Sequence, residues 1–127
     1  MTTFFAPQLI IPHDTRDIDF YATAFGAEEL QRWSNDGGSI HVAELSIDGA
    51  LFHLHEENTD KGRPSPTTQG STTVSVGLFV DDVAAVVDRA VGAGAKLITP
   101  PTDYDYAYRQ ADLLDPFGHH WIIEKKI

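Results

Sequence analysis

The sequence predicts an α+β domain of two βαβββ modules whose strands form a cupped mixed sheet. Two observations lead to this prediction. The order of one strand, one helix and three strands occurs twice, each time over about 60 residues. Each half contains one helix, whereas a doubly wound sheet has a helix after nearly every strand. We expect a single domain, with module one at about residues 1–57, a linker at about 58–70 and module two at about 71–127.

Module one begins with a short buried strand, PQLIIP. A helix follows, with Asp14 or Thr15 as its N-cap and Gly26 at its C-terminal end. Its buried face consists of apolar residues at helical spacing: Ile18, Tyr21, Ala22 and Phe25. After a strand that contains Trp33, the runs SIHVAELSI and ALFHLHEE form a hairpin, because the Asp-Gly pair at 48–49 is typical of a tight turn.

Module two follows the polar stretch NTDKGRPSPTTQG, which is rich in proline and glycine and therefore reads as a loop or linker. The run TTVSVGLFV predicts a strand, and Asp81 or Asp82 caps the next helix. The buried face of this helix carries Val83, Val86, Val87 and Val91. The Pro-Pro pair at 100–101 breaks the strand AKLIT, and a tyrosine-rich turn leads to a strand at about 108–114. A DPFG turn and the strand HWIIE complete the module.

The composition excludes several classes of function. The formal charge of −10 repels phosphate backbones and anionic lipid, so we expect neither nucleic acid nor membrane as a partner. This charge favours a cationic ligand, although it also serves solubility alone. The absence of cysteine excludes disulfides and thiolate chemistry. No segment has the length and hydrophobicity of a membrane helix or a signal peptide, and we expect a cytoplasmic protein.

Four segments carry a family resemblance. DFYATAFGAEEL, VAELSIDG, FVDDVAAVVDRAVGAGAKLITPP and DPFGHHW resemble, in this order, the first helix, the third strand, the second helix and the closing turn of the vicinal oxygen chelate superfamily. This superfamily comprises glyoxalases, bleomycin resistance proteins and dioxygenases, and the last segment is similar to a glyoxalase-like subgroup. The resemblance covers nearly the whole chain and implies the glyoxalase/bleomycin-resistance fold. That fold hosts lyases, isomerases, dioxygenases, thiol transferases and binding proteins, so it does not define the function.

The resemblance also implies where a metal ion would be bound, on the first, fourth, fifth and eighth strands. The corresponding positions are Ala6 or Gln8, His53, Ser75 and Ile122. Ile122 and Ala6 have no ligating atom, Ser75 is a poor ligand, and Gln8 is a weak one. We therefore expect no metal ion of the family type and no other cofactor.

Histidines offer a displaced metal site as an alternative. His53 and His55 lie two residues apart on one strand, so they share a face, opposite the face of Phe52 and Leu54 that we assign to the core. Glu44 can join them from the neighbouring strand. The other interpretation is that both imidazoles line a polar cup. The remaining histidines are assigned to turns, loops and the surface: His13, His41, His119 and His120.

Aromatic and polar residues predict a binding cup, since rigid rings offer a large contact area at low entropic cost. The predicted ligand-binding residues are Gln8, Trp33, Glu44, His53, His55, Ser75, Gln110 and Asp112, with Tyr104 and Tyr106 at the rim. The tyrosines form either a lid or a dimer seam. Trp121 has the opposite strand parity to Ile122, so we place it in the core.

The function we favour is metal-free binding of a small cationic or aromatic molecule, which resembles the drug-sequestering, antibiotic-resistance members of the superfamily. One alternative is a lyase or isomerase of the glyoxalase type, dependent on a metal or on acid–base catalysis by groups such as Asp103, Asp105, Asp112 and Glu44. Another is a bare scaffold with a collapsed cup. The sequence contains no recognised nucleophile motif. We expect a homodimer with a twofold interface.

Overall fold

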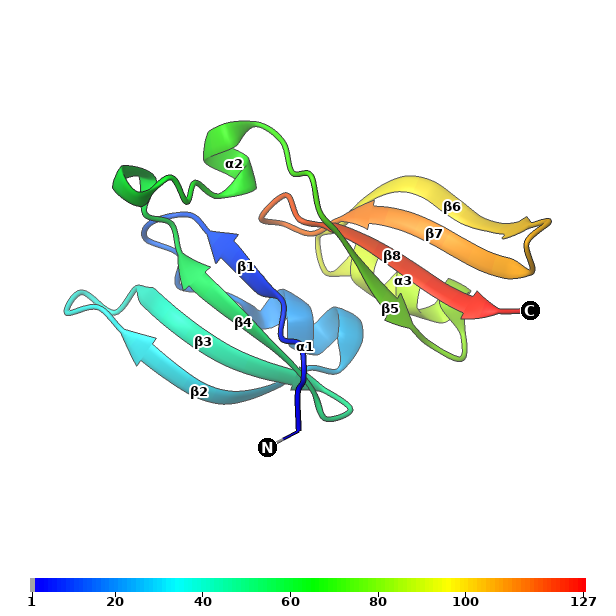
Figure 1. Ribbon diagram of the computed structural model, residues 1–127, viewed down its shortest axis with the longest axis horizontal. Helices are drawn as coiled ribbons and strands as arrows, with labels where there is room; N and C mark the ends of the chain where they lie inside the picture. The colour runs from blue at the N-terminus through cyan, green and yellow to red at the C-terminus, as the bar shows by residue number, and fades with distance from the viewer. Residues whose placement is uncertain (1) are drawn as a thin grey trace.

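The computed structural model describes residues 2–127 and confirms the predicted pair of βαβββ modules. Its two four-stranded mixed sheets have the strand orders β1-β4-β3-β2 and β5-β8-β7-β6. They lie side by side with α1 and α3 behind them (Figure 1). The elements are β1 (Gln8–Ile11), α1 (Asp19–Phe25), β2 (Glu28–Ser34), β3 (Ile40–Ile47), β4 (Ala50–Glu56), a 3-10 helix (Thr59–Lys61), α2 (Pro66–Gln69), β5 (Ser75–Phe79), α3 (Val83–Gly92), β6 (Lys96–Tyr104), β7 (Tyr108–Leu114) and β8 (His120–Lys126).

Helix α1 begins later than the sequence indicates. The prediction of Asp14 or Thr15 as its N-cap was wrong, because the N-cap is Ile18, whose side chain makes no capping bond. The Thr15 hydroxyl instead donates to the carbonyl of Pro12 (2.8 Å), which stabilises a turn ahead of the helix. The C-terminal end is as predicted. Gly26 adopts the left-handed conformation (φ 68°), which a residue with a side chain adopts only at a cost.

Module two confirms one local prediction and corrects another. Asp82 caps α3, since its carboxylate accepts the backbone N–H of Ala85 at 3.0 Å. The Pro-Pro pair at 100–101 does not break the strand, because β6 is an edge strand and both prolines lie in a register shift between Thr99 and Thr102, where neither has a strand partner. The register of β6 shifts on both sides of Thr99. Two residues predicted on buried helix faces, Ala22 and Val91, are exposed.

A single hydrophobic core joins the two modules. Trp121 of β8 is 2% exposed, and its ring lies 4.7 Å from that of Phe25 and 6.0 Å from that of Phe52, both in module one. The hydroxyl of Tyr21 (2.6 Å) and the indole N–H of Trp121 (3.0 Å) donate to the same buried carboxylate oxygen of Asp115. The placement of Trp121 in the core is therefore confirmed. These contacts link the modules through side chains, while each sheet keeps its own hydrogen bonds.

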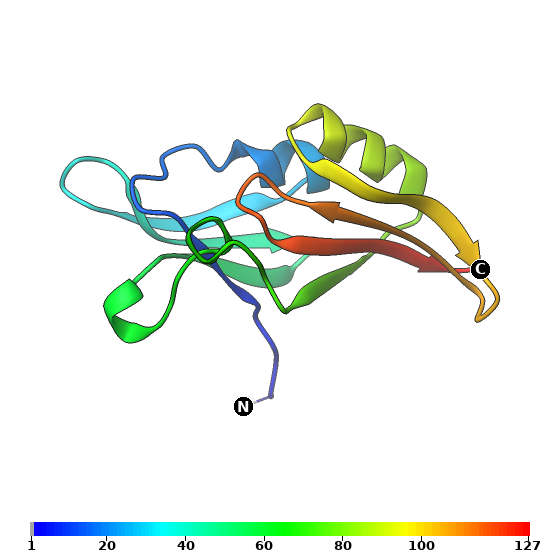
Figure 2. The same ribbon diagram turned by 90° about the horizontal axis from the view of Figure 1, so that it is seen from above.

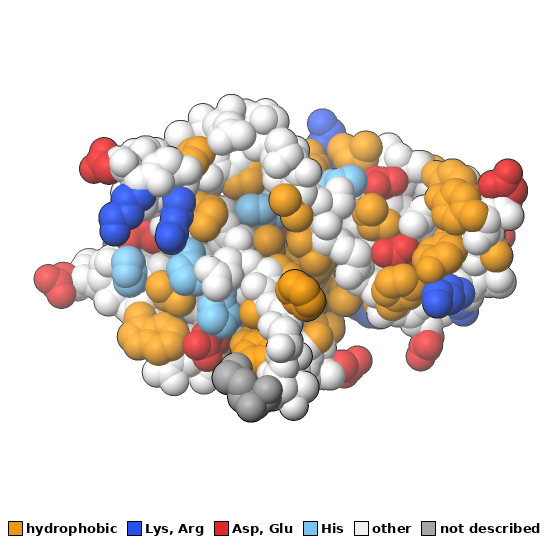
Figure 3. Space-filling view, in the orientation of Figure 1, with side chains coloured by type: hydrophobic (Ala, Val, Ile, Leu, Met, Phe, Trp, Pro, Cys, Tyr) orange, Lys and Arg blue, Asp and Glu red, His pale blue; other side chains and the backbone are white. Residues whose placement is uncertain are grey.

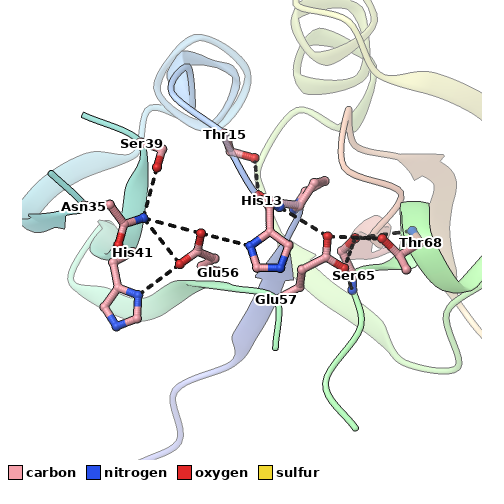
Figure 4. Close-up of polar contacts among 10 residues, drawn as sticks. His13, Thr15, Asn35, Ser39, His41, Glu56, Glu57, Ser65 and Thr68 are labelled. Atoms are coloured by element: carbon pink, nitrogen blue, oxygen red, sulfur yellow. Dashed lines mark hydrogen bonds and ion pairs between the residues drawn. The ribbon is translucent and has the colours of Figure 1, made fainter. Parts of the chain in front are cut away.

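The stretch 58–70, which we expected as a loop or linker, contains the 3-10 helix and α2. Asn58 and Ser65 cap these short helices with their side chains. The buried carboxylate of Glu57 accepts the backbone N–H of Ser65 (3.2 Å) and the hydroxyl of Thr68 (3.1 Å), which ties the stretch to the end of β4 (Figure 4). Among residues 2–127, no helix has both the length and the apolar character needed to cross a membrane.

Candidate functional site

Each sheet has one face packed on its helix and one face left open. Both helices lie on the same side of the sheets, so that both open faces point away from them (Figure 2). We call the open side of β1-β4-β3-β2 the first open face, and that of β5-β8-β7-β6 the second open face. The predicted ligand-binding residues divide between them. The first carries Gln8, Trp33, Glu44, His53 and His55, the second carries Ser75, Tyr104, Gln110 and Asp112, and Tyr106 lies in the β6–β7 turn.

On the first open face, strand register arranges the predicted residues in two adjacent rows. One row consists of Gln8, His53, Glu44 and Gln31, which are successive partners across β1, β4, β3 and β2. The next row consists of Ile10, His55, Val42 and Trp33. Phe52 and Leu54 are buried on the other side, as their alternation with the two histidines predicted. The structure therefore brings together the five predicted residues of module one.

The imidazoles of His53 and His55 stack on one another, with centroids 5.7 Å apart and planes 22° apart. The Nε2 atoms of both rings are buried and make no hydrogen bond to the described residues. Burial lowers the pKa of His55, and His53 lowers it further, so this imidazole is neutral at neutral pH. A pair of ring nitrogens without partners inside a cup is available to a ligand that offers hydrogen-bonding groups.

Next to His55, a carboxylate lies between two further histidines. Glu56 accepts from Nδ1 of His13 at 3.1 Å and from Nδ1 of His41 at 3.2 Å (Figure 4). The bond to Glu56 raises the pKa of His13, and the same bond lowers the pKa of Glu56. We had assigned His13 and His41 to the ordinary surface, and that assignment missed this cluster. It lines a hollow of about 430 Å³ whose wall also includes Lys61 and Arg63.

The second open face has a hydrogen-bonded chain at the start of β5. The hydroxyl of Ser75 lies 2.5 Å from Nδ1 of His120, and Nε2 of His120 lies 2.8 Å from a carboxylate oxygen of Asp112. His120 is the strand partner of Ser75, so the register of β5 on β8 places the two side chains on one face. Ser75 and Asp112 were predicted site residues. His120 was missed, although it has the strand parity of the inward position Ile122.

The other end of this face is aromatic and acidic. Tyr104 and Tyr106 stack with centroids 5.2 Å apart and planes 8° apart. The hydroxyl of Tyr106 donates to the side-chain oxygen of Gln110 (2.5 Å), and the amide of Gln110 donates to Glu124 (2.8 Å). Glu124 is 8% exposed and was missed by sequence reasoning, although its parity also points to this face. A Cβ at Gly77 would lie 2.6 Å from the Glu124 carboxylate, so glycine leaves room for it.

The residues present do not fit a divalent metal ion of the family type. Gln8 and His53 are neighbours on the first open face, whereas Ser75 and Ile122 lie on the second. Ile122 has no lone pair to offer. In the displaced site, Nε2 of His53 lies 3.9 Å from the Glu44 carboxylate. Within residues 2–127, no group of three or more His, Cys, Asp or Glu side chains is arranged to hold a metal ion.

A larger hollow, about 670 Å³, lies elsewhere, between the β3–β4 hairpin and the β5–α3 connection. Its walls include Phe25, Asp48, Val86 and Arg89, and it contains none of the ten predicted residues. Size alone therefore does not mark the site, and the rows of polar side chains on the open faces are the stronger indication.

His119, which we assigned to a turn, has a structural role. Its side chain is buried and bonds through Nε2 to the backbone carbonyl of Ile10 (2.7 Å). Because Ile10 belongs to β1 and His119 directly precedes β8, this bond helps to hold the modules together.

Comparison with known proteins gives a consistent picture. The family described as "Glyoxalase/Bleomycin resistance protein/Dioxygenase superfamily" matches residues 7–123. An uncharacterized protein of Mycobacterium bovis is 35% identical over 125 residues, which cover 96% of this chain and 82% of that protein. A gene product of Arabidopsis thaliana has a TM-score of 0.74 at 25% identity, with 98% of this chain and 100% of that chain covered. FosX of Listeria monocytogenes, a fosfomycin resistance protein, shares the fold at a TM-score of 0.70 and 16% identity, over 98% of this chain and 93% of its own.

Proposed function

Because this chain belongs to the glyoxalase/bleomycin resistance protein/dioxygenase superfamily, we propose that it binds a small aromatic cation on its second open face, without a metal ion. The proposal follows the drug-sequestering members that the sequence resembles. The observation that carries it is the parallel stack of Tyr104 and Tyr106 beside the nearly buried carboxylate of Glu124. Phenol rings attract cations through their faces, and a carboxylate adds a direct charge interaction.

Electrostatics at this end of the sheet support a cationic ligand. The pKa of the Tyr106 phenol is raised by desolvation, then by Tyr104, and further by the negative charges of Asp105, Asp112 and Glu124. A group whose anionic form is disfavoured by its neighbours lies in a negative potential. The formal charge of the chain, −10, has the same sign. The net charge of the chain therefore attracts a cation at long range, and the carboxylates near Tyr106 attract it at short range.

We also propose that two chains form a homodimer in which the first open face completes the binding cup with His53, His55, Glu44 and Trp33. The edge strands β1 and β5 make no ladder to each other, and apolar side chains along the open region, such as Phe79 (57% exposed), remain uncovered. A second copy related by a twofold axis would cover such edges. Light scattering at micromolar concentration should give twice the 14.0 kDa of one chain, and a mass of one chain would contradict it.

The binding proposal is tested by titration calorimetry with two ligands of the same shape, N-methylacridinium and neutral acridine. We expect the cation to bind more tightly. Tyr104→Leu removes one ring of the stack and should cost about 0.5–2 kcal/mol of binding free energy, or roughly 2- to 30-fold in affinity. Glu124→Gln should reduce the preference for the cation.

Two controls show whether the second open face holds the ligand and whether a metal ion takes part. Val91→Ala changes an exposed apolar residue of α3, behind the sheets and away from both open faces, and should leave binding unchanged, in contrast to Tyr104→Leu. EDTA should leave the titration unchanged. Equal binding of the two ligands, loss of binding with EDTA, or no effect of Tyr104→Leu would each contradict the proposal.

A further inference from the structure

We propose that Ser75 is a nucleophile for acyl transfer, activated by His120 and Asp112, and that its substrates are small esters. The three side chains come from the adjacent strands β5, β8 and β7. The Ser75 hydroxyl lies 2.5 Å from Nδ1 of His120, whose Nε2 lies 2.8 Å from Asp112. A hydroxyl bonded to an imidazole that is held by a carboxylate is the arrangement by which proteins activate serine. This activity is separate from the binding proposed for the tyrosine end of the same face.

The bond partners define where the protons lie. An ionised carboxylate only accepts hydrogen bonds, so Nε2 of His120 carries a proton toward Asp112. In the neutral imidazole, Nδ1 then has a free lone pair, and it accepts the hydroxyl proton of Ser75. When Nδ1 takes that proton, the resulting imidazolium remains bonded to Asp112, which stabilises its charge. The imidazole therefore acts as the general base, and Asp112 holds it in the required tautomer.

The nucleophile is accessible and its base is held in place. Ser75 is exposed on the open face, whereas the side chains of His120 and Asp112 are 27% and 25% exposed. The backbone N–H of Val80 donates to the backbone carbonyl of Glu124 on β8. Alternate residues of a strand point their N–H groups to opposite sides, so those of Ser75 and Gly77 point toward the free edge of β5. The N–H of Ser75 belongs to the same residue as the nucleophile and is available to a developing oxyanion.

The reaction is a two-step ester hydrolysis. The Oγ of Ser75 attacks the ester carbonyl carbon while its proton moves to Nδ1 of His120. The tetrahedral intermediate expels the alcohol, which takes that proton, and the acyl group remains on Oγ. A water molecule then gives a proton to Nδ1 and attacks the acyl carbon. Release of the carboxylic acid returns the proton to Oγ, so the only other reactant is water.

The test uses p-nitrophenyl acetate, with release of p-nitrophenolate followed by absorbance, and a fluorophosphonate, with the adduct located by peptide mass spectrometry. We expect one adduct per chain, on the peptide that contains Ser75. Ser75→Ala should abolish the adduct. His120→Gln keeps a polar side chain but removes the base, and it should slow labelling by about 100-fold or more. Asp112→Asn should also slow it, because the asparagine amide can donate a hydrogen bond to Nε2 and so favour the wrong tautomer.

Two further variants make the result specific. Ser71 is an exposed serine four residues before Ser75, with no side-chain hydrogen bond among the described residues, and Ser71→Ala should label like the wild type. Ser34 is an exposed serine at the end of β2 in module one, and Ser34→Ala should also label like the wild type. Labelling of Ser71 as fast as Ser75, full esterase activity in Ser75→Ala, or unchanged labelling in His120→Gln would overturn the proposal. Circular dichroism of each variant checks that the fold is retained.

Discussion

The two modules have the same topology and different surface chemistry. The first open face and its neighbouring hollow gather histidines beside Lys61 and Arg63, and these groups are visible together over module one (Figure 3). The second open face carries mainly tyrosines and carboxylates, with His120 beside Ser75. In both, strand register places the polar side chains in rows on the side away from the helix. The repeat therefore keeps the positions that face a ligand, while the residue types at those positions determine what each face can bind.

The cores of the modules differ in another way. Module one contributes the aromatic rings of Phe20, Tyr21, Phe25 and Phe52. Module two contributes mainly aliphatic side chains, and its one large buried ring, Trp121, packs against those of module one. The modules thus differ in surface chemistry, but one core formed by both of them stabilises the chain. Changes in the shared core should affect the whole chain, and changes on an open face should remain local.

Replacing each tryptophan in turn should give the largest contrast. Trp121→Ala opens a cavity among aromatic rings and removes an indole bond to Asp115, so we expect a loss of about 3–5 kcal/mol in the free energy of unfolding. Trp33→Ala, at a position 45% exposed, should change it by about 0.5 kcal/mol or less. Urea denaturation measures both. Similar losses for the two variants would show that the open face is part of the core.

A smaller effect is expected for the hydroxyl that joins the modules. Tyr21→Phe removes the 2.6 Å bond to the buried Asp115 carboxylate and should cost about 1.5–3 kcal/mol. Tyr106→Phe removes a hydroxyl of the same type that bonds to Gln110 on the exposed face, and it should cost about 0.5 kcal/mol or less. Chemical denaturation of the two variants compares them directly. If Tyr106→Phe costs as much as Tyr21→Phe, the distinction between shared core and open faces does not hold.

The sequence predicted the parts that depend on local pattern. Strand alternation and turn residues indicated the module order, the Asp48-Gly49 hairpin and the inward side of each strand, so the ten predicted residues lie on the open faces or in the β6–β7 turn. The errors arose where tertiary context decides. The edge position of β6 tolerates Pro100 and Pro101, and a turn stabilised by Thr15 delays α1. Neither effect is visible in the local sequence.

Contacts between residues that are far apart in the sequence could not be predicted for the same reason. The sequence placed His120 beside the last turn, at the start of the strand HWIIE, and gave it no partner, yet parallel pairing of β5 with β8 places it beside Ser75, 45 residues earlier. Glu56 is likewise joined to His13 across 43 residues. Strand parity indicated the face of His120 and Glu124, but only the register of the strands shows which side chains meet on it.

Two exposed ion pairs, one in each module, should respond differently to pH. His13 has a raised pKa through its bond to Glu56, so the stability it adds is complete below its ordinary value of 6.5 and is lost as pH rises through the raised value. Glu56 has a lowered pKa, so its contribution is complete above its ordinary value of 4.5 and is lost as pH falls through the lowered value. The pair therefore stabilises most between pH 4.5 and 6.5.

In module two, Arg109 lowers the pKa of Asp103, and arginine does not titrate in the working range. The unfolding free energy of Glu56→Gln should therefore approach that of the wild type as pH rises above 6.5, while the difference between Asp103→Asn and the wild type should stay constant from pH 6.5 to 8. Urea denaturation of the three proteins at each pH measures both differences. Because both pairs are exposed, the differences should be small and should shrink with added salt. A constant difference for Glu56→Gln over the same interval would show that the charge of His13 does not stabilise module one, and the two pairs would then be equivalent.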